Sequence, residues 1–332
     1  MTETELATKA PESDAQPAAV ADDVPTSSSH PTLGEHCTSD RPTPVGQAST
    51  GEITKFGDVN VYISKPADYP HTPSKLLLLL TGGTGLNSIN NQIQADRYAS
   101  EGYVVVMPDL FDGDPAPNSS TISDEPTTPG SLLDMFKIKA AETAKSFLID
   151  MWLARHTEEK VMPILHKVMD ACRDEFADAV SNGGGIYAVG YCFGGRYILL
   201  LGAERTTAPL GRGFPWSAMS PAPVDEEAAQ LTSSGPFIKA GAVAHATLVS
   251  TDDFTGLKVP ISMVSVENDP LFPDEVRIAG EDYMSKNNVE HEVQVYPGVP
   301  HGFAVVGEYD DQNIKDAQAT AFEQMLKWIK EH

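Results

Sequence analysis

The chain has 332 residues, 41% of them hydrophobic, and a formal net charge of −24 at pH 7. This size and composition predict a globular protein with one large core, or with one core and a lid. The acidity is distributed, because the six acids and one base of residues 1–30 contribute only −5. Such a charge argues against nucleic acids and anionic membrane surfaces as partners, since both bind clusters of Lys and Arg.

The beginning of the chain is rich in Ala, Pro, Ser, Thr and acids. This composition predicts a disordered acidic tail over residues 1–48, followed by one domain over residues 49–332. No secretion signal is predicted, and the sequence lacks a run of about 18 apolar residues that could span a membrane. Cys37, Cys172 and Cys192 make an odd number without the spacing of a disulfide framework. We therefore expect a cytoplasmic protein.

Predicted strands and helices alternate along the chain. Strands are predicted at residues 59–64, 75–80, 103–107, 186–190, 241–250, 261–266 and 290–296. Helices are predicted at residues 91–101, 131–154, 157–180, 193–201, 274–287 and 313–330. This order indicates one α/β domain with a mainly parallel, doubly wound sheet, flanking helices and right-handed crossovers. The helices at 131–154 and 157–180 fill a single connection, and they form either a lid or a flank packed on the sheet.

The most informative motif is Gly190-Tyr191-Cys192-Phe193-Gly194, between an apolar strand and a helix. Strand, sharp turn and helix in this order are typical of the nucleophile elbow G-x-S-x-G, here with cysteine in place of serine. The glycines let the strand and the helix cross closely, and a helix N-terminus favours a thiolate. Taken alone, the motif is equally consistent with a small apolar cysteine packed between the two elements.

Two later loops supply an acid and a histidine in the order nucleophile, acid, histidine. Asp269 follows one predicted strand and His301 follows the next. Loops at the carboxyl ends of parallel strands converge, so Cys192, Asp269 and His301 can meet. His301 would accept the thiol proton, and Asp269 would orient the imidazole. Glu267 is the alternative acid, but Asp269 lies further into its loop.

The glycine-rich loop at residues 81–85 is the candidate for half of an oxyanion hole. One backbone N–H would come from Phe193, directly after the nucleophile, and the second from Gly83. A dinucleotide-phosphate loop is the alternative, but Ser88 occupies the place of the third glycine of that fingerprint. The candidate substrate-binding residues are Gly82, Phe111, His245 and Phe303, with Trp152 as a further candidate wall. His245 falls inside the predicted strand at 241–250, so a core histidine is the alternative there.

These motifs together resemble the dienelactone hydrolase family, particularly its fungal branch. The resemblance is carried by the cysteine pentad, by Asp269-Pro-Leu-Phe-Pro and by His301-Gly-Phe, with further likeness at residues 90–96 and 102–111. It covers roughly residue 51 to the C-terminus. It implies an α/β-hydrolase fold and a Cys-Asp-His triad that cleaves esters or lactones, with no metal or organic cofactor.

The chain departs from the family pattern at the substrate. Members that act on dienelactones carry a glutamate against the resting thiol, where this chain has Gly82. They also bind the substrate carboxylate with two arginines, at positions that correspond here to residues 112–114 and 304–306. Without these two arginines, the chain lacks the bidentate carboxylate partners that would favour an anionic lactone. We therefore expect a neutral small-molecule ester or lactone, with a catalytically silent binding protein as the alternative, and the oligomeric state is left open.

Overall fold

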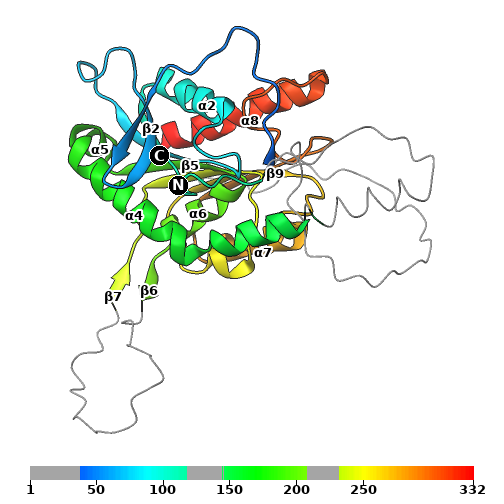
Figure 1. Cartoon of the computed structure of the whole chain (residues 1–332). Coiled ribbons are helices and arrows are strands. Elements are labelled where there is room, and N and C mark those ends of the chain that lie inside the picture. Colours follow the sequence, from blue (N-terminus) through cyan, green and yellow to red (C-terminus); the bar gives the residue numbers. More distant parts are fainter. Residues whose placement is uncertain (1–37, 118–143, 145, 208–231) are drawn as a thin grey trace, which may run out of the picture. The chain divides into compact units, whose positions relative to one another are not determined.

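The computed structural model describes residues 38–117, 144, 146–207 and 232–332. Within these residues, eight strands form one sheet in the order β1-β2-β4-β3-β5-β8-β9-β10 (Figure 1). Their bounds are Glu52–Phe56 (β1), Val59–Ser64 (β2), Lys75–Leu80 (β3), Tyr103–Pro108 (β4), Ile186–Tyr191 (β5), Ala240–Ala244 (β8), Ile261–Val266 (β9) and His291–Tyr296 (β10). Neighbouring strands from β4 to β10 are parallel, whereas β1 and β2 join the edge antiparallel. The sheet is thus the mainly parallel one that the sequence predicts.

Helices cover both faces of the sheet (Figure 1). One face carries α2 (Ile89–Ser100) and α8 (Gln312–Glu331). The other carries α4 (Glu158–Glu175), α5 (Ala177–Gly183), α6 (Phe193–Gly202) and α7 (Asp274–Lys286). None of the helices in the described residues is both long and apolar enough to cross a membrane.

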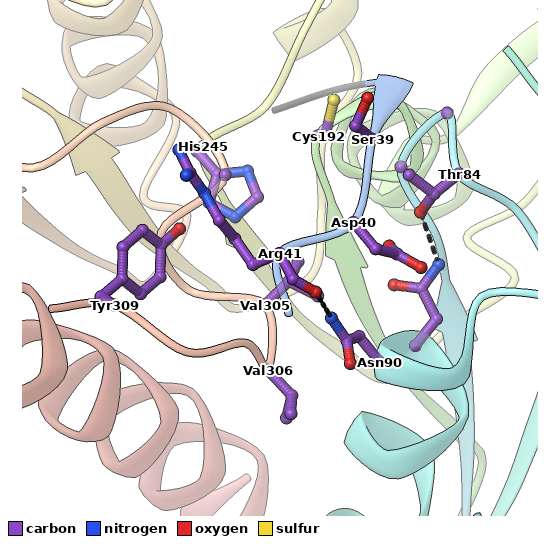
Figure 2. Close-up of a pocket in the computed structure, with 14 residues that line it drawn as sticks. Ser39, Asp40, Arg41, Thr84, Asn90, Cys192, His245, Val305, Val306 and Tyr309 are labelled. Atoms are coloured by element: carbon purple, nitrogen blue, oxygen red, sulfur yellow. Dashed lines mark hydrogen bonds between the residues drawn. The ribbon is translucent and has the colours of Figure 1, made fainter. Parts of the chain in front are cut away.

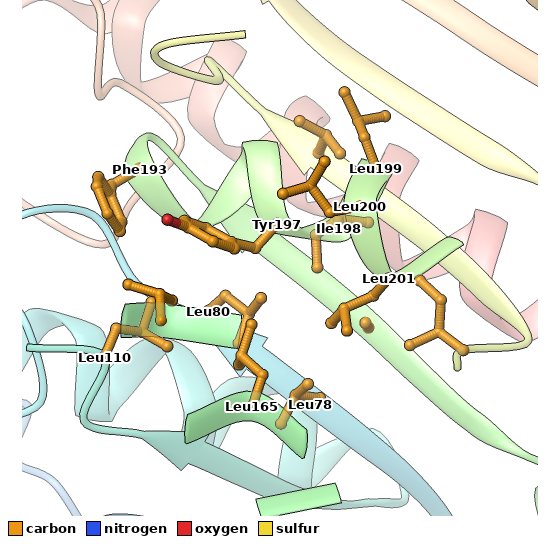
Figure 3. Packing of buried hydrophobic residues seen from close by; sticks show 14 of the residues in the cluster. Leu78, Leu80, Leu110, Leu165, Phe193, Tyr197, Ile198, Leu199, Leu200 and Leu201 are labelled. Carbon is orange, nitrogen blue, oxygen red and sulfur yellow. The ribbon is translucent and has the colours of Figure 1, made fainter. Parts of the chain in front are cut away.

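β3 lies near the middle of the sheet and consists of one lysine and five leucines. Its leucines divide between the two faces, because side chains alternate along a strand. Leu78 and Leu80 belong to the same buried cluster as Leu165 of α4 and Tyr197 of α6 (Figure 3). The intervening leucines pack in the cluster beneath α2 and α8. A strand covered on both faces is apolar throughout, which explains the unbroken leucine run.

β8 ends earlier than the sequence predicts. The predicted strand at 241–250 continues past Ala244, but His245 and Leu248 have positive φ angles of 37° and 62°. Such a backbone conformation does not fit a strand, so the chain turns away from the sheet after Ala244. His245 therefore lies in the loop that follows β8, and not in the middle of a strand.

Other differences from the predicted elements are smaller. The predicted helix at 157–180 is two helices, α4 and α5, which are separated at Phe176 where φ is −127°. The edge strand β1 and the short antiparallel pair β6 (Arg205–Thr207) and β7 (Thr232–Ser234) are not among the predicted strands. Residues 1–37 of the predicted tail, with Cys37, lie outside the described residues, as do residues 118–143 and 145 of the region predicted as a lid or flank.

Candidate active site

Cys192 lies at the sharp turn between β5 and α6. Its φ and ψ are 49° and −116°, an unusual conformation for a residue with a side chain, and only 3% of the residue is exposed. A Cβ at Gly190 would lie 2.5 Å from Ile198, and one at Gly194 would collide with the carbonyl of Leu80. The two glycines of the motif are thus required by the close crossing of α6 over the strands, as in a nucleophile elbow.

The structure brings His301 and Asp269 together at the ends of neighbouring strands. His301 follows β10, Asp269 follows β9, and Nδ1 of the imidazole lies 2.6 Å from Oδ2 of the carboxylate. The other carboxylate oxygen accepts the N–H of Leu271 at 2.9 Å. Asp269 is 3% exposed, whereas Glu267 is exposed, so the geometry favours Asp269 as the partner of the histidine.

A threonine that the sequence analysis missed connects the thiol with the imidazole. Thr247 Oγ1 lies 3.3 Å from Sγ of Cys192 and 3.2 Å from Nε2 of His301. The predicted strand at 241–250 contains Thr247, so the sequence does not indicate that this residue lies in a loop beside the site. Its position shortly after the true end of β8 is the signal that could have found it, since loops at the carboxyl ends of strands converge.

Electrostatic interactions within this group favour a charged histidine. Burial by itself lowers the pKa of His301, but the negative charge of the Cys192 thiolate and the hydrogen bond to Asp269 outweigh it. Together they raise the pKa of His301 to about 9. A negative charge on Cys192 and a positive charge on His301 would therefore stabilise each other.

The early loop predicted for the oxyanion hole is bonded to the elbow. The N–H of Gly194 donates to the carbonyl of Thr81 at 3.0 Å, and Gly83 lines the same cavity as Cys192. A Cβ at Gly82 would lie 3.1 Å from Cβ and 3.6 Å from Sγ of Cys192. A side chain at position 82 would thus press on Cys192, and glycine keeps the approach to the thiol open.

The aromatic residues predicted for the pocket have different locations. Phe111 is 1% exposed and packs behind Phe193 and Trp152, with ring centroids 5.1 Å and 4.9 Å away. Phe303 is fully buried and belongs to the core beneath α8. Its ring centroid lies 6.1 Å from that of His245. Neither Phe111 nor Phe303 lines the two cavities beside Cys192 that are described below, so both support the walls from behind.

The smaller of the two cavities has a volume of about 30 Å³ and contains Cys192 and His245 in its wall (Figure 2). The imidazole of His245 lies 5.0 Å from that of His301, ring centroid to ring centroid. Figure 2 shows Asp40 and Arg41 on a segment that passes beside Cys192. This segment belongs to the region predicted as a tail, and no sequence signal pointed to its place in the site.

Several hydrogen bonds fix the segment that carries Asp40 and Arg41. Asn90 donates to the carbonyl of Arg41 at 2.7 Å, and Ser88 donates to the carboxylate of Asp40 at 2.9 Å. The guanidinium of Arg41 lies over the ring of Tyr309, 5.1 Å from its centroid. Burial raises the pKa of Asp40, against the effect of its hydroxyl partners. An acid and a base thus enter this cavity together.

The larger cavity, about 460 Å³ in volume, lies beside the first turn of α6. Phe193, Tyr197, Thr247 and Leu248 form part of its wall, together with Arg196. The guanidinium of Arg196 is already engaged, because it donates to both carboxylate oxygens of Asp253 at 3.0 Å and to Glu158 at 3.1 Å. Among the described residues, the structure contains no group of three or more His, Cys, Asp and Glu side chains that could hold a metal ion.

Comparison with known proteins assigns the chain to a family. The sequence model of the dienelactone hydrolase family matches residues 59–221 and 226–332. The chain belongs to the dienelactone hydrolase family. It is accordingly a hydrolase that acts on ester bonds.

Individual relatives support the same assignment. The chain is 28% identical over 282 residues to the hydrolase pyvD of Aspergillus violaceofuscus, which covers 85% of this chain and 90% of the relative. It is 26% identical to "Dienlactone hydrolase 1" of Gibberella moniliformis, over 84% of this chain and 87% of the relative. Both relatives are fungal, which agrees with the resemblance seen in the sequence.

A solved structure has the same fold. Esterase 2 of Thermogutta terrifontis with propionate bound has a TM-score of 0.52 and 15% identity, over 86% of this chain and 96% of that chain. With the eight-stranded, mainly parallel sheet, this likeness confirms the α/β-hydrolase fold that the sequence predicts.

Proposed function

We propose that the protein is a cysteine-dependent hydrolase that cleaves a small, neutral ester or lactone through Cys192, His301 and Asp269. The observation that carries this proposal is the hydrogen-bonded arrangement around His301. Its Nδ1 lies 2.6 Å from Asp269, while its other nitrogen faces the hydroxyl of Thr247 and the thiol. An imidazole held in this way has the orientation and tautomer that a general base needs.

The first half of the reaction forms an acyl-enzyme. With the thiol proton already on His301, Sγ of Cys192 attacks the carbonyl carbon of the substrate. The resulting oxyanion is stabilised by the backbone N–H groups of Phe193 and Gly83. Collapse of this intermediate breaks the C–O bond, and Nε2 of His301 gives its proton to the leaving alkoxide.

The second half releases the acid. Water gives a proton to His301 and attacks the thioester carbonyl, and the same N–H groups stabilise the new oxyanion. Collapse breaks the C–S bond, restores the Cys192 thiolate beside the protonated His301, and frees the carboxylic acid. With a lactone, the alcohol and the acid remain parts of one opened product. The chemistry needs no redox step and no further reactant besides water.

The charges around the elbow support a neutral substrate. Gly113 and Val305 stand where carboxylate-binding arginines would be expected, and Arg196 is bound by two acids in the larger cavity. Glu159 adds a further acid to the wall of that cavity. A substrate carboxylate there would meet net negative charge, whereas an uncharged group can pack against the aromatic wall.

The test is a comparison of matched substrates that differ only in a free carboxylate or its amide. We expect the neutral member of each pair to have the higher kcat/KM, and added salt to narrow the difference by screening the acidic protein. Cys192→Ala provides the control for background hydrolysis.

A preference for the carboxylate member would contradict the neutral-substrate proposal. Arg41→Gln then locates the cause, because Arg41 is the arginine that lines the smaller cavity with Cys192. If that variant loses the preference for the carboxylate, Arg41 replaces the arginines found elsewhere in the family.

A further inference from the structure

The loop after β8 places a hydroxyl between the thiol and the imidazole. Thr247 is 1% exposed, and its Oγ1 lies within 3.3 Å of Sγ and 3.2 Å of Nε2. Its N–H donates to the carbonyl of Cys192 at 3.1 Å, and the N–H of Cys192 donates to the carbonyl of Ala244 at 3.1 Å. The loop is therefore bonded to the elbow in both directions, which fixes the hydroxyl beside the two reacting groups.

Asp269 determines which protons the imidazole presents to that hydroxyl. A carboxylate only accepts, so the 2.6 Å contact places a proton on Nδ1 of His301. When the ring is charged, Nε2 also carries a proton. A threonine hydroxyl has one proton and two lone pairs, so it can accept from Nε2 and donate to Sγ at the same time.

We propose that Thr247 is a catalytic residue whose hydroxyl donates a hydrogen bond to the Cys192 thiolate while it accepts one from the protonated His301. The proposal rests on the proposed function, in which Cys192 is the nucleophile. The thiol proton passes to Nε2 of His301. The hydroxyl of Thr247 keeps its own proton throughout this step. A hydrogen bond to an ion is stronger than one to a neutral group, so the hydroxyl favours the thiolate over the thiol.

The positive charge of the protonated His301 also stabilises the thiolate. Thr247 supplies a hydrogen-bond donor from the side of the larger cavity, whose wall it also forms. A donor at a fixed position and a nearby positive charge hold the sulfur in one place and stabilise its charge before the substrate arrives. This role depends on the hydroxyl, and the methyl group of threonine contributes only packing.

Other charged and titratable groups face the same space and would be unchanged in variants of Thr247. They are His245 after β8, Asp40 and Arg41 in the smaller cavity, and His156, Glu158, Glu159 and Arg196 in the larger one. A change in the titration of the thiol on loss of the hydroxyl can therefore be assigned to position 247.

The experiment compares Thr247→Val, which keeps the shape and removes the hydroxyl, with Thr247→Ser, which keeps the hydroxyl. The rate of Cys192 alkylation by iodoacetamide is measured against pH by peptide mass spectrometry, on the full chain. We expect the midpoint of the curve for Thr247→Val to rise by about one to two pH units. At a pH below both midpoints its alkylation should slow by about ten- to a hundredfold, whereas Thr247→Ser keeps the wild-type midpoint.

An unchanged midpoint in Thr247→Val would overturn the proposal, and so would a Thr247→Ser midpoint shifted as far as that of Thr247→Val. Melting temperatures identify a variant that fails to fold, and Thr247→Ala supplies a second variant without the hydroxyl.

Ester hydrolysis by Cys192→Ala separates the two proposals. Retained hydrolysis in that variant would contradict the proposed function. The alkylation curves do not depend on turnover, so they decide the role of Thr247 independently.

Discussion

Cys192 and Cys172 are both buried, with 3% and 0% of the residue exposed, but their neighbours differ. Cys192 lies at a turn beside the hydroxyl of Thr247, and it interacts electrostatically with His301. Cys172 lies on the buried face of α4, and burial raises the pKa of its thiol to about 12. Since the burial is similar, we expect the neighbouring proton donors and acceptors to decide which of the two thiols can act as a nucleophile.

The largest expected effect is a difference in ester hydrolysis between alanine variants of the two cysteines. Cys192→Ala should lower kcat/KM for an ester by about 10⁴-fold or more, because the nucleophile is lost. Cys172→Ala should keep the wild-type rate, since its side chain lies in the core. Hydrolysis by both purified variants is measured after their melting temperatures are compared. Equal activity in both variants would show that Cys192 is not the nucleophile.

The second prediction concerns the acid that distinguishes the surroundings of Cys192. Asp269→Asn should lower kcat by about 10³- to 10⁴-fold, because an amide no longer holds the required tautomer of His301. The melting temperature should change little, since the amide is nearly the same size. Glu267→Gln is the matched control and should keep the wild-type kcat. A reversal, with the Glu267 variant inactive and the Asp269 variant mild, would identify Glu267 as the acid.

A third prediction uses the pKa of His301, raised to about 9 mainly by the Cys192 thiolate and Asp269. The raised pKa keeps the ring protonated through neutral pH, and the proton is lost as the pH rises through about 9. Above that pH, His301 cannot protonate a poor leaving group. The kcat/KM for an alkyl ester should then fall about tenfold per pH unit, whereas a nitrophenyl ester needs no acid and should not decline. Parallel declines for both esters would contradict this role of His301.

The smallest expected effect is a difference in the free energy of unfolding between serine variants at Cys172 and Cys192. Cys172→Ser puts a hydroxyl into an apolar cluster and should lower the free energy of unfolding by about 1–3 kcal/mol. Cys192→Ser should cost less, because Thr247 and His301 can partner the new hydroxyl. Urea unfolding of both variants measures the difference. A larger loss at position 192 would show that the thiol there has a packing role that a hydroxyl cannot replace.

The sequence was sufficient for much of the fold. β2, β3 and β9 have the predicted bounds, because each is a short apolar run between polar or turn-forming residues. The helical spacing of Cys172 with Val161, Leu165 and Val168 indicates one buried face, and the four residues share one buried cluster. The order of the motifs resembles one family, and this resemblance predicted both the family and the fold. Both are confirmed.

The end of β8 could not be read from the sequence. The apolar run continues to Val249, so its pattern gives no reason to stop at Ala244. Tertiary hydrogen bonds turn the chain there, because the N–H of His245 donates to the carbonyl of Val264 at 2.7 Å and that of Thr247 to Cys192. For this reason the sequence pattern predicts a strand at His245 and gives no sign that Thr247 enters the site.

The sequence by itself placed Cys192, Asp269 and His301 in loops or turns after predicted strands, because strand patterns and the residues after them are local properties. Only the tertiary structure decided which further side chains enter the site. Asp40 and Arg41 lie in a polar segment without periodicity, and they reach the cavity through contacts with Ser88 and Asn90, which are 48 and 49 residues away in the chain. Contacts between residues so distant in sequence depend on how the whole chain packs, and no local pattern encodes them.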